Sequence, residues 1–254
     1  MPGSQGVLPV VEVDLGPGVR AGFTTRSGGV SEPPWDALNL GLEVGDATGS
    51  VLANRTLVER WVGARVAFAS QVHGADVRVL AGPPALSATS VGLYDALVST
   101  SPSVAVAVLV ADCVPILLAD VEAGVVGAVH AGRRGLVAGV VQAAVEVLVG
   151  AGAKPGRLRA VVGPSISGAA YEVPEAMRDE VAAVLPETWA TTAWGTPALD
   201  LPAGVAAVLG RAGVQDVRRL GICTTTDERF YSHRLAGRRT GTTGRFAGVV
   251  RLEG

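Results

Sequence analysis

The sequence is poor in charge, in aromatic side chains and in the residue types that most often bind transition metals. Charged residues make up 17% of the 254 residues and aromatic residues 4%, and the chain has only two Cys and three His. Hydrophobic residues make up 48%, which predicts a large buried core rather than disorder. The net charge of −2, without a long run of Lys or Arg, argues against binding to nucleic acid.

Signals for secretion and for a membrane span are also missing. The first residues, Met-Pro-Gly-Ser-Gln, have neither a basic head nor an apolar segment. The longest apolar run, Leu136–Val145, is interrupted by Gln142 and is shorter than the about 18–20 residues that a span needs. We therefore expect a cytoplasmic protein without a membrane partner, in which Cys113 and Cys223 stay reduced and unpaired.

Apolar strand-like runs alternate with helix-like segments, which predicts an α/β fold in one domain over residues 1–254. The run Val104–Val110 is typical of a strand buried on both faces. Ser50 is the expected N-cap of the first helix. The expected strands are 7–13, 20–24, 66–72, 76–80, 94–99, 104–110, 114–118, 124–129, 158–162, 217–222 and 248–252, and the expected helices are 51–62, 136–149, 174–185 and 201–212.

Three of the five Cys and His residues follow strand-like runs. His73, Cys113 and His130 come after residues 66–69, 104–110 and 124–129. Strand ends are where α/β proteins place their chemistry, and one thiolate with two imidazoles suits zinc. The spacings of 40 and 17 residues match no zinc finger. No fourth ligand is evident, apart from a carboxylate such as Asp112, so an open site of the catalytic type is favoured.

The same side chains allow two other interpretations. Cys113 could be a nucleophile with His130 or His73 as its base. All three could also be residues of the core or of loops without chemistry, since free Cys is among the most buried residue types. The residue types alone do not separate these alternatives.

Several arginines lie in or beside polar or glycine-containing stretches, where a guanidinium group suits a phosphate or a carboxylate. They are Arg26, Arg55, Arg134 and Arg245. Arg26 begins a glycine loop that is either an anion-binding nest or a plain turn. Asn54 and Arg55 lie off the apolar stripe of their helix, so they are solvated or functional. The run Arg234–Arg239 indicates a ligand contact or a surface feature.

The helix expected after Gly135 would direct free amides and the positive end of its dipole toward His130. We expect an anion to bind there, next to the candidate metal ligands.

Eight short motifs occur in an order that resembles the YfiH family of laccase-domain proteins, also called polyphenol oxidases or peptidoglycan editing factors. The resemblance runs from about residue 20 to the C-terminus. Each motif is weak alone, whereas the ordered set is specific. The motifs are Arg26-Ser-Gly-Gly-Val-Ser31, Leu38-Asn-Leu-Gly41, Asn54-Arg55, Gln71-Val-His-Gly74, Ala111-Asp-Cys-Val-Pro115, His130-Ala-Gly-Arg-Arg-Gly135, Gly163-Pro-Ser-Ile166 and Thr243-Gly-Arg245.

The resemblance implies a single-domain α/β/β/α sandwich with two mixed β-sheets and a zinc ion held by His73, Cys113 and His130. It implies purine nucleoside phosphorolysis, in which adenosine, inosine or methylthioadenosine reacts with phosphate to give a base and ribose 1-phosphate. Adenosine deamination is associated with the same site. The older family name links it to copper and phenol oxidation, and the fold resembles that of some cysteine hydrolases.

On this basis we expect a zinc-dependent purine nucleoside phosphorylase that acts as a monomer or homodimer. A cysteine hydrolase or amidase of peptidoglycan precursors, a copper oxidase and a non-enzymatic zinc protein are the alternatives. Phosphate would meet Arg134, Arg26 and the helix after Gly135, and Asp112 would carry a proton or support a ligand. The expected substrate contacts are Arg26, Asn39, Arg55, Gln71 and Arg245.

Two residues depart from the family pattern. Arg133 stands where the family usually has Trp, and His233 stands where it often has an aromatic residue. Replacing a stacking ring by a cation leaves substrate preference more open than metal binding.

Overall fold

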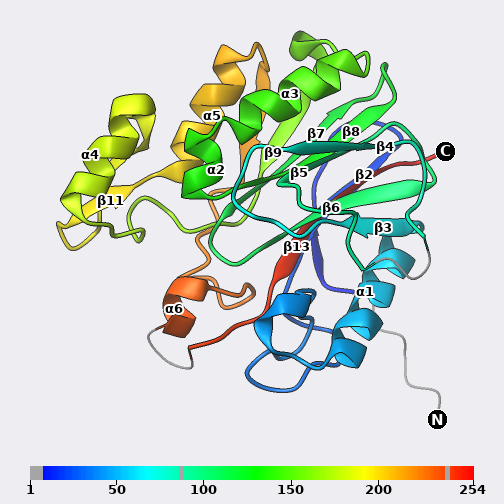
Figure 1. Cartoon of the computed structure of the whole chain (residues 1–254), viewed down its shortest axis with the longest axis horizontal. Coiled ribbons are helices and arrows are strands. Elements are labelled where there is room, and N and C mark those ends of the chain that lie inside the picture. The colour runs from blue at the N-terminus through cyan, green and yellow to red at the C-terminus, as the bar shows by residue number, and fades with distance from the viewer. Residues whose placement is uncertain (1–7, 86–88, 238–240) are drawn as a thin grey trace.

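Two β-sheets lie face to face between helices in the computed structural model, which describes residues 8–85, 89–237 and 241–254 (Figure 1). The five-stranded sheet has the order β1-β2-β13-β6-β3 and the six-stranded sheet the order β12-β9-β7-β8-β5-β4. The pairs β3–β6, β4–β5 and β9–β12 are parallel and the other pairs are antiparallel, so both sheets are mixed.

Each predicted strand has a counterpart in one of the two large sheets, and each predicted helix corresponds to one or two helices. In the five-stranded sheet the strands are β1 Val10–Glu12, β2 Val19–Thr24, β13 Phe246–Leu252, β6 Val104–Val110 and β3 Arg65–Phe68. In the six-stranded sheet they are β12 Asp216–Arg219, β9 Arg159–Val162, β7 Val114–Asp120, β8 Val125–Ala131, β5 Ala96–Ser99 and β4 Val77–Leu80. The helices are α1 Thr48–Val62, α2 Arg133–Val137, α3 Val140–Gly150, α4 Glu175–Val184, α5 Leu201–Arg211 and α6 His233–Gly237.

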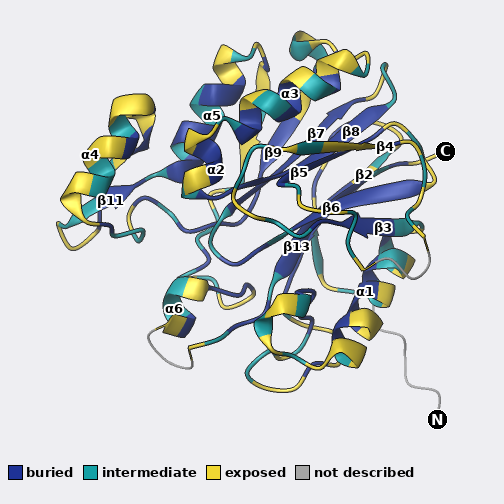
Figure 2. Cartoon of the chain, in the orientation of Figure 1, coloured by how far each residue is buried: buried dark blue, intermediate teal, exposed yellow. Residues whose placement is uncertain are grey.

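The buried side chains form three successive layers of core, which confirms the predicted α/β/β/α sandwich. Between the sheets, Phe23 and Val106 of one sheet belong to the same cluster as Leu117 of the other. A second cluster joins the six-stranded sheet to α3, α4 and α5, and a third joins α1 to the five-stranded sheet. Figure 2 shows the central strands of both sheets buried, the edge strand β4 largely exposed, and the helices exposed on their outer faces. None of the described helices is both long and apolar enough to cross a membrane.

Several predicted boundaries were wrong for local reasons. The helix expected over 136–149 is two helices, because Gly139 has a left-handed φ of 92° and separates α2 from α3. Helix α1 begins at Thr48 after Ala47, without a side-chain cap, so Ser50 is not its N-cap. The strand expected over 66–72 ends at Phe68, where the chain leaves its sheet. Short elements that were not predicted include β10 Trp189–Thr191, β11 Pro197–Leu199 and α6.

Two connections carry the chain from one sheet to the other at the same end of the sandwich. Residues 69–76 lead from β3 to β4, and residues 111–113 lead from β6 to β7. His73 lies in the first connection and Cys113 in the second. His130 lies near the end of β8, beside β7. The topology therefore gathers the three predicted ligand residues where the two sheets meet.

Candidate metal centre

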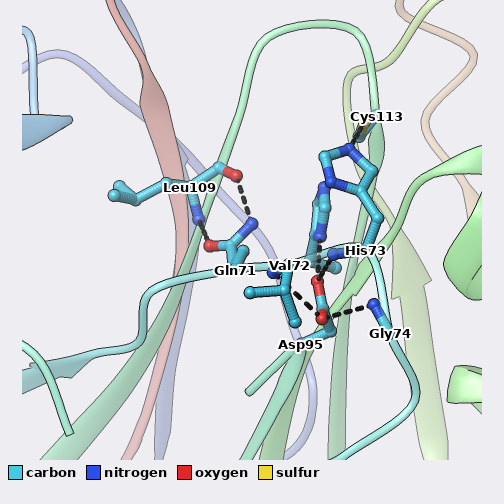
Figure 3. Close-up of polar contacts among 8 residues, drawn as sticks. Gln71, Val72, His73, Gly74, Asp95, Leu109 and Cys113 are labelled. Atoms are coloured by element: carbon cyan, nitrogen blue, oxygen red, sulfur yellow. Dashed lines mark hydrogen bonds and ion pairs between the residues drawn. The ribbon is translucent and has the colours of Figure 1, made fainter. Parts of the chain in front are cut away.

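His73, Cys113 and His130 form one cluster. Their candidate ligand atoms all lie within 4.8 Å of one another. The Cys113 Sγ atom is 3.6 Å from His73 Nε2, and the two imidazole rings meet edge to face with centroids 4.7 Å apart (Figure 3). Tetrahedral zinc, with bonds of about 2.0–2.1 Å to nitrogen and 2.3 Å to sulfur, needs donor atoms about 3.3–3.6 Å apart. The Cys113–His73 separation matches this spacing, and the three donor atoms suit a four-coordinate metal ion once the 4.8 Å cluster closes on it.

Asp95 supports the cluster, although its residue type and position gave no reason to single it out from the sequence. Its Oδ1 atom is 2.8 Å from His130 Nδ1, and both side chains are buried. The same carboxylate accepts hydrogen bonds from the backbone amides of Val72, His73 and Gly74 at 3.2, 2.9 and 2.7 Å (Figure 3). A carboxylate on one ring nitrogen of a histidine leaves the other nitrogen for a metal. Asp95 thus orients one ligand and holds the loop of another.

The weak sequence signal for Asp95 is that it directly precedes β5, whose four residues are all buried. Burial alone would raise the pKa of Asp95, but the hydrogen bonds from His130 and from the loop amides outweigh it and keep that pKa below its usual value. An ionised carboxylate is therefore kept beside His130.

Two non-glycine residues of the described chain have positive φ, and both belong to this site. His73 has φ 60° and Asp112 has φ 90°. Such conformations cost on the order of 1–3 kcal/mol and persist where neighbouring contacts enforce them. Asp95 enforces the first. For the second, the Asp112 carboxylate accepts hydrogen bonds from the Thr224 hydroxyl and the Arg234 amide, each at 2.6 Å.

Gly132 must lack a side chain for the ligand atoms to stay accessible. A Cβ atom at this position would lie 2.5 Å from a ring carbon of His73 and 3.1 Å from Cys113 Sγ. It would fill the space beside the donor atoms. This close approach explains the glycine of the His-Ala-Gly motif.

The electrostatics of the cluster favour a thiolate. Burial alone would raise the pKa of Cys113, but the charge of His130 and hydrogen bonds from both histidines lower it. Burial alone would lower the pKa of His130, whereas the Cys113 thiolate and Asp95 raise it. Thiolate is the form in which cysteine binds metals and attacks electrophiles.

Two cavities reach the cluster, with volumes of about 530 and 360 Å³. Both are lined by His73, Ala111, Cys113 and His233. We call the larger one, which extends to Arg55, Gln71 and Arg245, the first cavity. The second cavity is lined further by Asp112, Ile166, Leu201, Tyr171, Arg133, Arg134 and Arg234. A ligand in either cavity would reach the cluster.

Most of the predicted contact residues line these cavities, but with fixed partners. Gln71 lines the first cavity, and its amide group exchanges two 2.7 Å hydrogen bonds with the backbone of Leu109 (Figure 3). Arg55 lines it too, but is buried and bonded to two backbone carbonyls rather than solvated. Burial lowers the pKa of Arg55 to about 10, against the raising effect of Glu59. Arg245 bonds to the carbonyls of residues 243 and 244.

Arg26 and Asn39 are not among the residues that line either cavity. Arg26 pairs with Asp36 at 3.1 Å and lies over the ring of Tyr231. Asn39 is fully buried and accepts a hydrogen bond from the Arg245 amide at 2.9 Å. Both residues hold the loop beneath the first cavity.

The contacts of Asp112, and the start and length of the helix after His130, differ from those expected from the sequence. Both carboxylate oxygens of Asp112 are occupied by Thr224 and Arg234, so it fixes the loop rather than standing free. The helix near His130 begins at Arg133 and has only five residues, and the longer helix starts at Val140. The expected long helix dipole is therefore not formed there. Of the run 234–239, residues 238 and 239 lie outside the described part.

Comparison with known proteins identifies the family. Residues 20–253 match the family model described as multi-copper polyphenol oxidoreductase laccase, so the chain belongs to this family, as the YfiH resemblance predicted. A Streptomyces coelicolor protein named purine nucleoside phosphorylase is 51% identical over 239 residues, which cover 93% of this chain and 96% of that protein.

Solved structures of the family share the fold. YlmD from Geobacillus stearothermophilus is 34% identical with a TM-score of 0.84, and the match covers 94% of this chain and 93% of that one. The Bacillus licheniformis hypothetical protein YfiH is 30% identical with a TM-score of 0.82 and 92% coverage of both chains. These structures confirm the mixed α/β fold.

The number of histidines in this chain does not suit the multi-copper oxidase that the family's name describes. Several copper ions with imidazole ligands would need more histidines than the three in this sequence. The described residues provide one His-Cys-His cluster, which has the donor atoms for one ion.

Proposed function

We propose that this protein is a zinc-dependent purine nucleoside phosphorylase that also deaminates adenosine. The observation that carries this proposal is a cluster of one thiolate and two imidazoles that lines two cavities of substrate size. The names of the relatives point to the same chemistry, since they are purine nucleoside phosphorylases at up to 51% identity.

The first cavity suits the nucleoside. It offers hydrogen-bonding groups of both kinds, including the hydroxyls of Ser70 and Ser90, the carboxylate of Glu43 and the guanidinium of Arg245. Ribose hydroxyls and purine edges need such mixed partners. Because Gln71 and Arg55 are held by backbone groups, the walls of this cavity are formed before a substrate enters.

The ligands of the ion are His73, Cys113 and His130, and Asp95 fixes the orientation of His130. When bound, zinc would supply a Lewis acid that polarises a water molecule or a substrate atom. Gly132 leaves room for that atom, and the exposed side of the cluster at His73 gives access to it.

For phosphorolysis, the protein must hold phosphate near ribose C1′ and stabilise the purine as it leaves. Arg134 is the predicted phosphate contact that lines a cavity, and Asp112 acts by holding the loop before Cys113. For deamination, a water molecule at the cluster replaces the amino group at purine C6.

Product analysis tests the proposal. The purified protein is incubated with inosine and with adenosine, with and without phosphate and with and without a chelator. We expect hypoxanthine and ribose 1-phosphate from inosine only when phosphate is present, and phosphate-independent inosine from adenosine. The chelator should suppress both reactions, and zinc should restore them better than copper. Absence of base release under all these conditions would refute the proposal.

A cysteine hydrolase acting on peptidoglycan precursors is a second candidate, favoured by one observation. Asp95, His130 and Cys113 form a chain in which a carboxylate orients an imidazole next to a thiolate. Peptide or amide hydrolysis that survives chelation and is abolished by alkylation of Cys113 would support this alternative.

A further inference from the structure

The two cavities differ in charge. The second cavity is lined by three arginines, Arg133, Arg134 and Arg234, and by one acidic residue, Asp112, whose two oxygens already accept hydrogen bonds from Thr224 and from the Arg234 amide. No carboxylate of the described residues forms an ion pair with any of the three arginines. In the first cavity, the two arginines are bonded to backbone carbonyls and Glu43 is also present. The second cavity therefore carries positive charge that no ion pair neutralises, which suits an anionic ligand.

Tyr171 organises these cations. The guanidinium of Arg234 lies over its ring, 5.1 Å from the centroid, and also donates a hydrogen bond to the carbonyl of Glu172 at 3.0 Å. Arg133 lines the same cavity as this tyrosine. Burial raises the pKa of Tyr171, as does the Cys113 thiolate, while Arg133 and Arg234 oppose this rise. Tyr171 therefore holds the guanidinium of Arg234 against its ring and is electrostatically coupled to Arg133.

We propose that the second cavity binds a tetrahedral phosphate group through Arg133 and Arg234, with Tyr171 as their positioning residue. This inference rests on the proposed phosphorolysis and assigns its inorganic phosphate to a cavity separate from the nucleoside. Guanidinium groups bind phosphate with two parallel hydrogen bonds each, and a site with several of them is charge-complementary to a dianion. The residue that departs from the family pattern, Arg133, thereby belongs to the phosphate site.

The placement also gives the reaction a direction. Because the cavities meet at His73 and Cys113, phosphate and nucleoside would approach each other there from two sides. A phosphate oxygen forms a bond to ribose C1′ while the bond from C1′ to purine N9 breaks. The electron pair of that bond leaves with the purine, and the proton carried by hydrogen phosphate ends on the purine. Attack from the side opposite the leaving base inverts the configuration at C1′.

Binding of inorganic phosphate to the metal-loaded protein, without nucleoside, tests the assignment directly. We expect Arg133→Gln and Arg234→Gln each to weaken phosphate binding by about 10-fold or more, as measured by calorimetry, since each removes a charged hydrogen-bond donor. Arg60→Gln, which removes the same charge from an exposed position on α1, is the matched control and should leave binding unchanged. Circular dichroism and thermal melting check that each variant is folded.

Steady-state kinetics adds a second readout. The two variants should raise the KM for phosphate by a similar factor and leave the KM for inosine within about twofold of the wild-type value. A rise in the KM for inosine alone would show that the arginines stack on the purine, and would overturn the proposal. Tyr171→Phe should raise the phosphate KM less than either arginine variant.

The phosphate group in this cavity could also belong to a nucleotide. Binding of inosine 5′-monophosphate to the same variants distinguishes a nucleotide site from a site for inorganic phosphate. If the nucleotide binds through Arg133 and Arg234 while inorganic phosphate binding is unaffected by their loss, the assignment to the co-substrate is wrong. If phosphate binding depends on both arginines but no nucleoside is cleaved, the phosphate site stands and the proposed function fails. If inosine is cleaved with a phosphate KM that the variants do not change, the proposed function stands and the phosphate site is refuted.

Discussion

Two regions of this protein look alike in sequence and differ in what their polar groups do. The loop of residues 26–46 and the connections that carry His73 and Cys113 both lie outside the sheets and contain several polar residues. In the loop, polar groups bond to one another and to the neighbouring helix. The side chain of Asn54 accepts a hydrogen bond from the amide of Val30 at 2.8 Å. It donates hydrogen bonds to the Ser31 hydroxyl and to the carbonyls of residues 37 and 39. In the connections, Asp95 satisfies the amides and leaves the ligand atoms facing the cavities.

The difference follows from the local backbone. Residues 26–46 contain only a short 3₁₀ segment, Leu42–Val44, so side chains must satisfy their backbone donors and acceptors. The connections are anchored at both ends by strands of two sheets, so one carboxylate is enough to hold each of them, Asp95 in the first and Asp112 in the second. Similar composition therefore gives a structural support in one region and a reactive site in the other.

Removal of the thiolate should have the largest effect. We expect Cys113→Ser to lose its bound metal and to lower nucleoside turnover by more than about 100-fold, because a direct ligand contributes more than the 10–100-fold typical of a supporting residue. Metal content by mass spectrometry and turnover with inosine and phosphate measure this. Cys223→Ser is the matched control and should keep both. Full phosphorolysis by the Cys113 variant would refute the proposed site.

Loss of the supporting carboxylate should have a smaller effect on the same readout. Asp95→Asn keeps the shape but removes the charge that orients His130 and holds the 72–74 amides, so metal affinity should fall by about 10–100-fold. Competition with a chelator measures the affinity. Asp76→Asn, an exposed neighbour, should leave it unchanged. An unchanged affinity in Asp95→Asn would mean that the backbone alone places His73 and His130.

The loop should respond in stability rather than in binding. Asn54→Ala removes four hydrogen bonds at a buried position, and we expect the free energy of unfolding to fall by ~2–4 kcal/mol. Urea denaturation measures this fall. Thr56→Ala, on the exposed side of the same helix, should change it by no more than ~0.5 kcal/mol. Because Glu43 of this loop lines the first cavity, a large loss of activity in Asn54→Ala protein that remains folded would show that the loop is more than a structural support.

A carboxylate remote from both regions provides the pH test. Buried Asp120 accepts hydrogen bonds from the amides of residues 123 and 154 and from Arg157. Burial alone would raise its pKa, but these partners lower it. Asp120 therefore stabilises the fold above the unfolded-state pKa of about 3.9, and this contribution is lost as the pH falls through the lower folded-state value.

The corresponding variant is Asp120→Asn. It should be less stable than the wild type by ~1–3 kcal/mol at neutral pH, and the gap should narrow below about pH 4. Urea midpoints across this pH range measure the gap. A gap that is the same at pH 3 and pH 7 would show that the charge of Asp120 does not matter.

The smallest effect is expected at Arg26, which the sequence suggested as a phosphate contact. Its partner Asp36 is half exposed, so Arg26→Gln should change stability by no more than ~1 kcal/mol and the phosphate KM by no more than about twofold. A tenfold rise of that KM would bring the loop into the phosphate site and remove the contrast between the two regions.

Local pattern was enough to predict the strands, most helices and the residue types of the metal cluster. Val104–Val110 is apolar throughout because it is buried between layers, and β6 has those bounds. Cys113 and His130 could be recognised because they follow such runs. The break between α2 and α3 depends on the left-handed backbone at Gly139, which an apolar helical pattern does not reveal.

The sequence by itself determined the α/β class and the presence of one thiolate and two imidazoles at strand ends, because apolar periodicity and donor chemistry are local properties, whereas the layered sandwich was implied by the family resemblance. Only the tertiary structure decided that Asp95 supports His130, that Arg26 and Asn39 brace a loop, and that Arg133 and Arg234 share a cavity. Hydrogen-bond partners and cavity walls come together across long stretches of chain, 206 residues in the case of Asn39 and Arg245, and proximity of that kind leaves no periodic trace in the sequence.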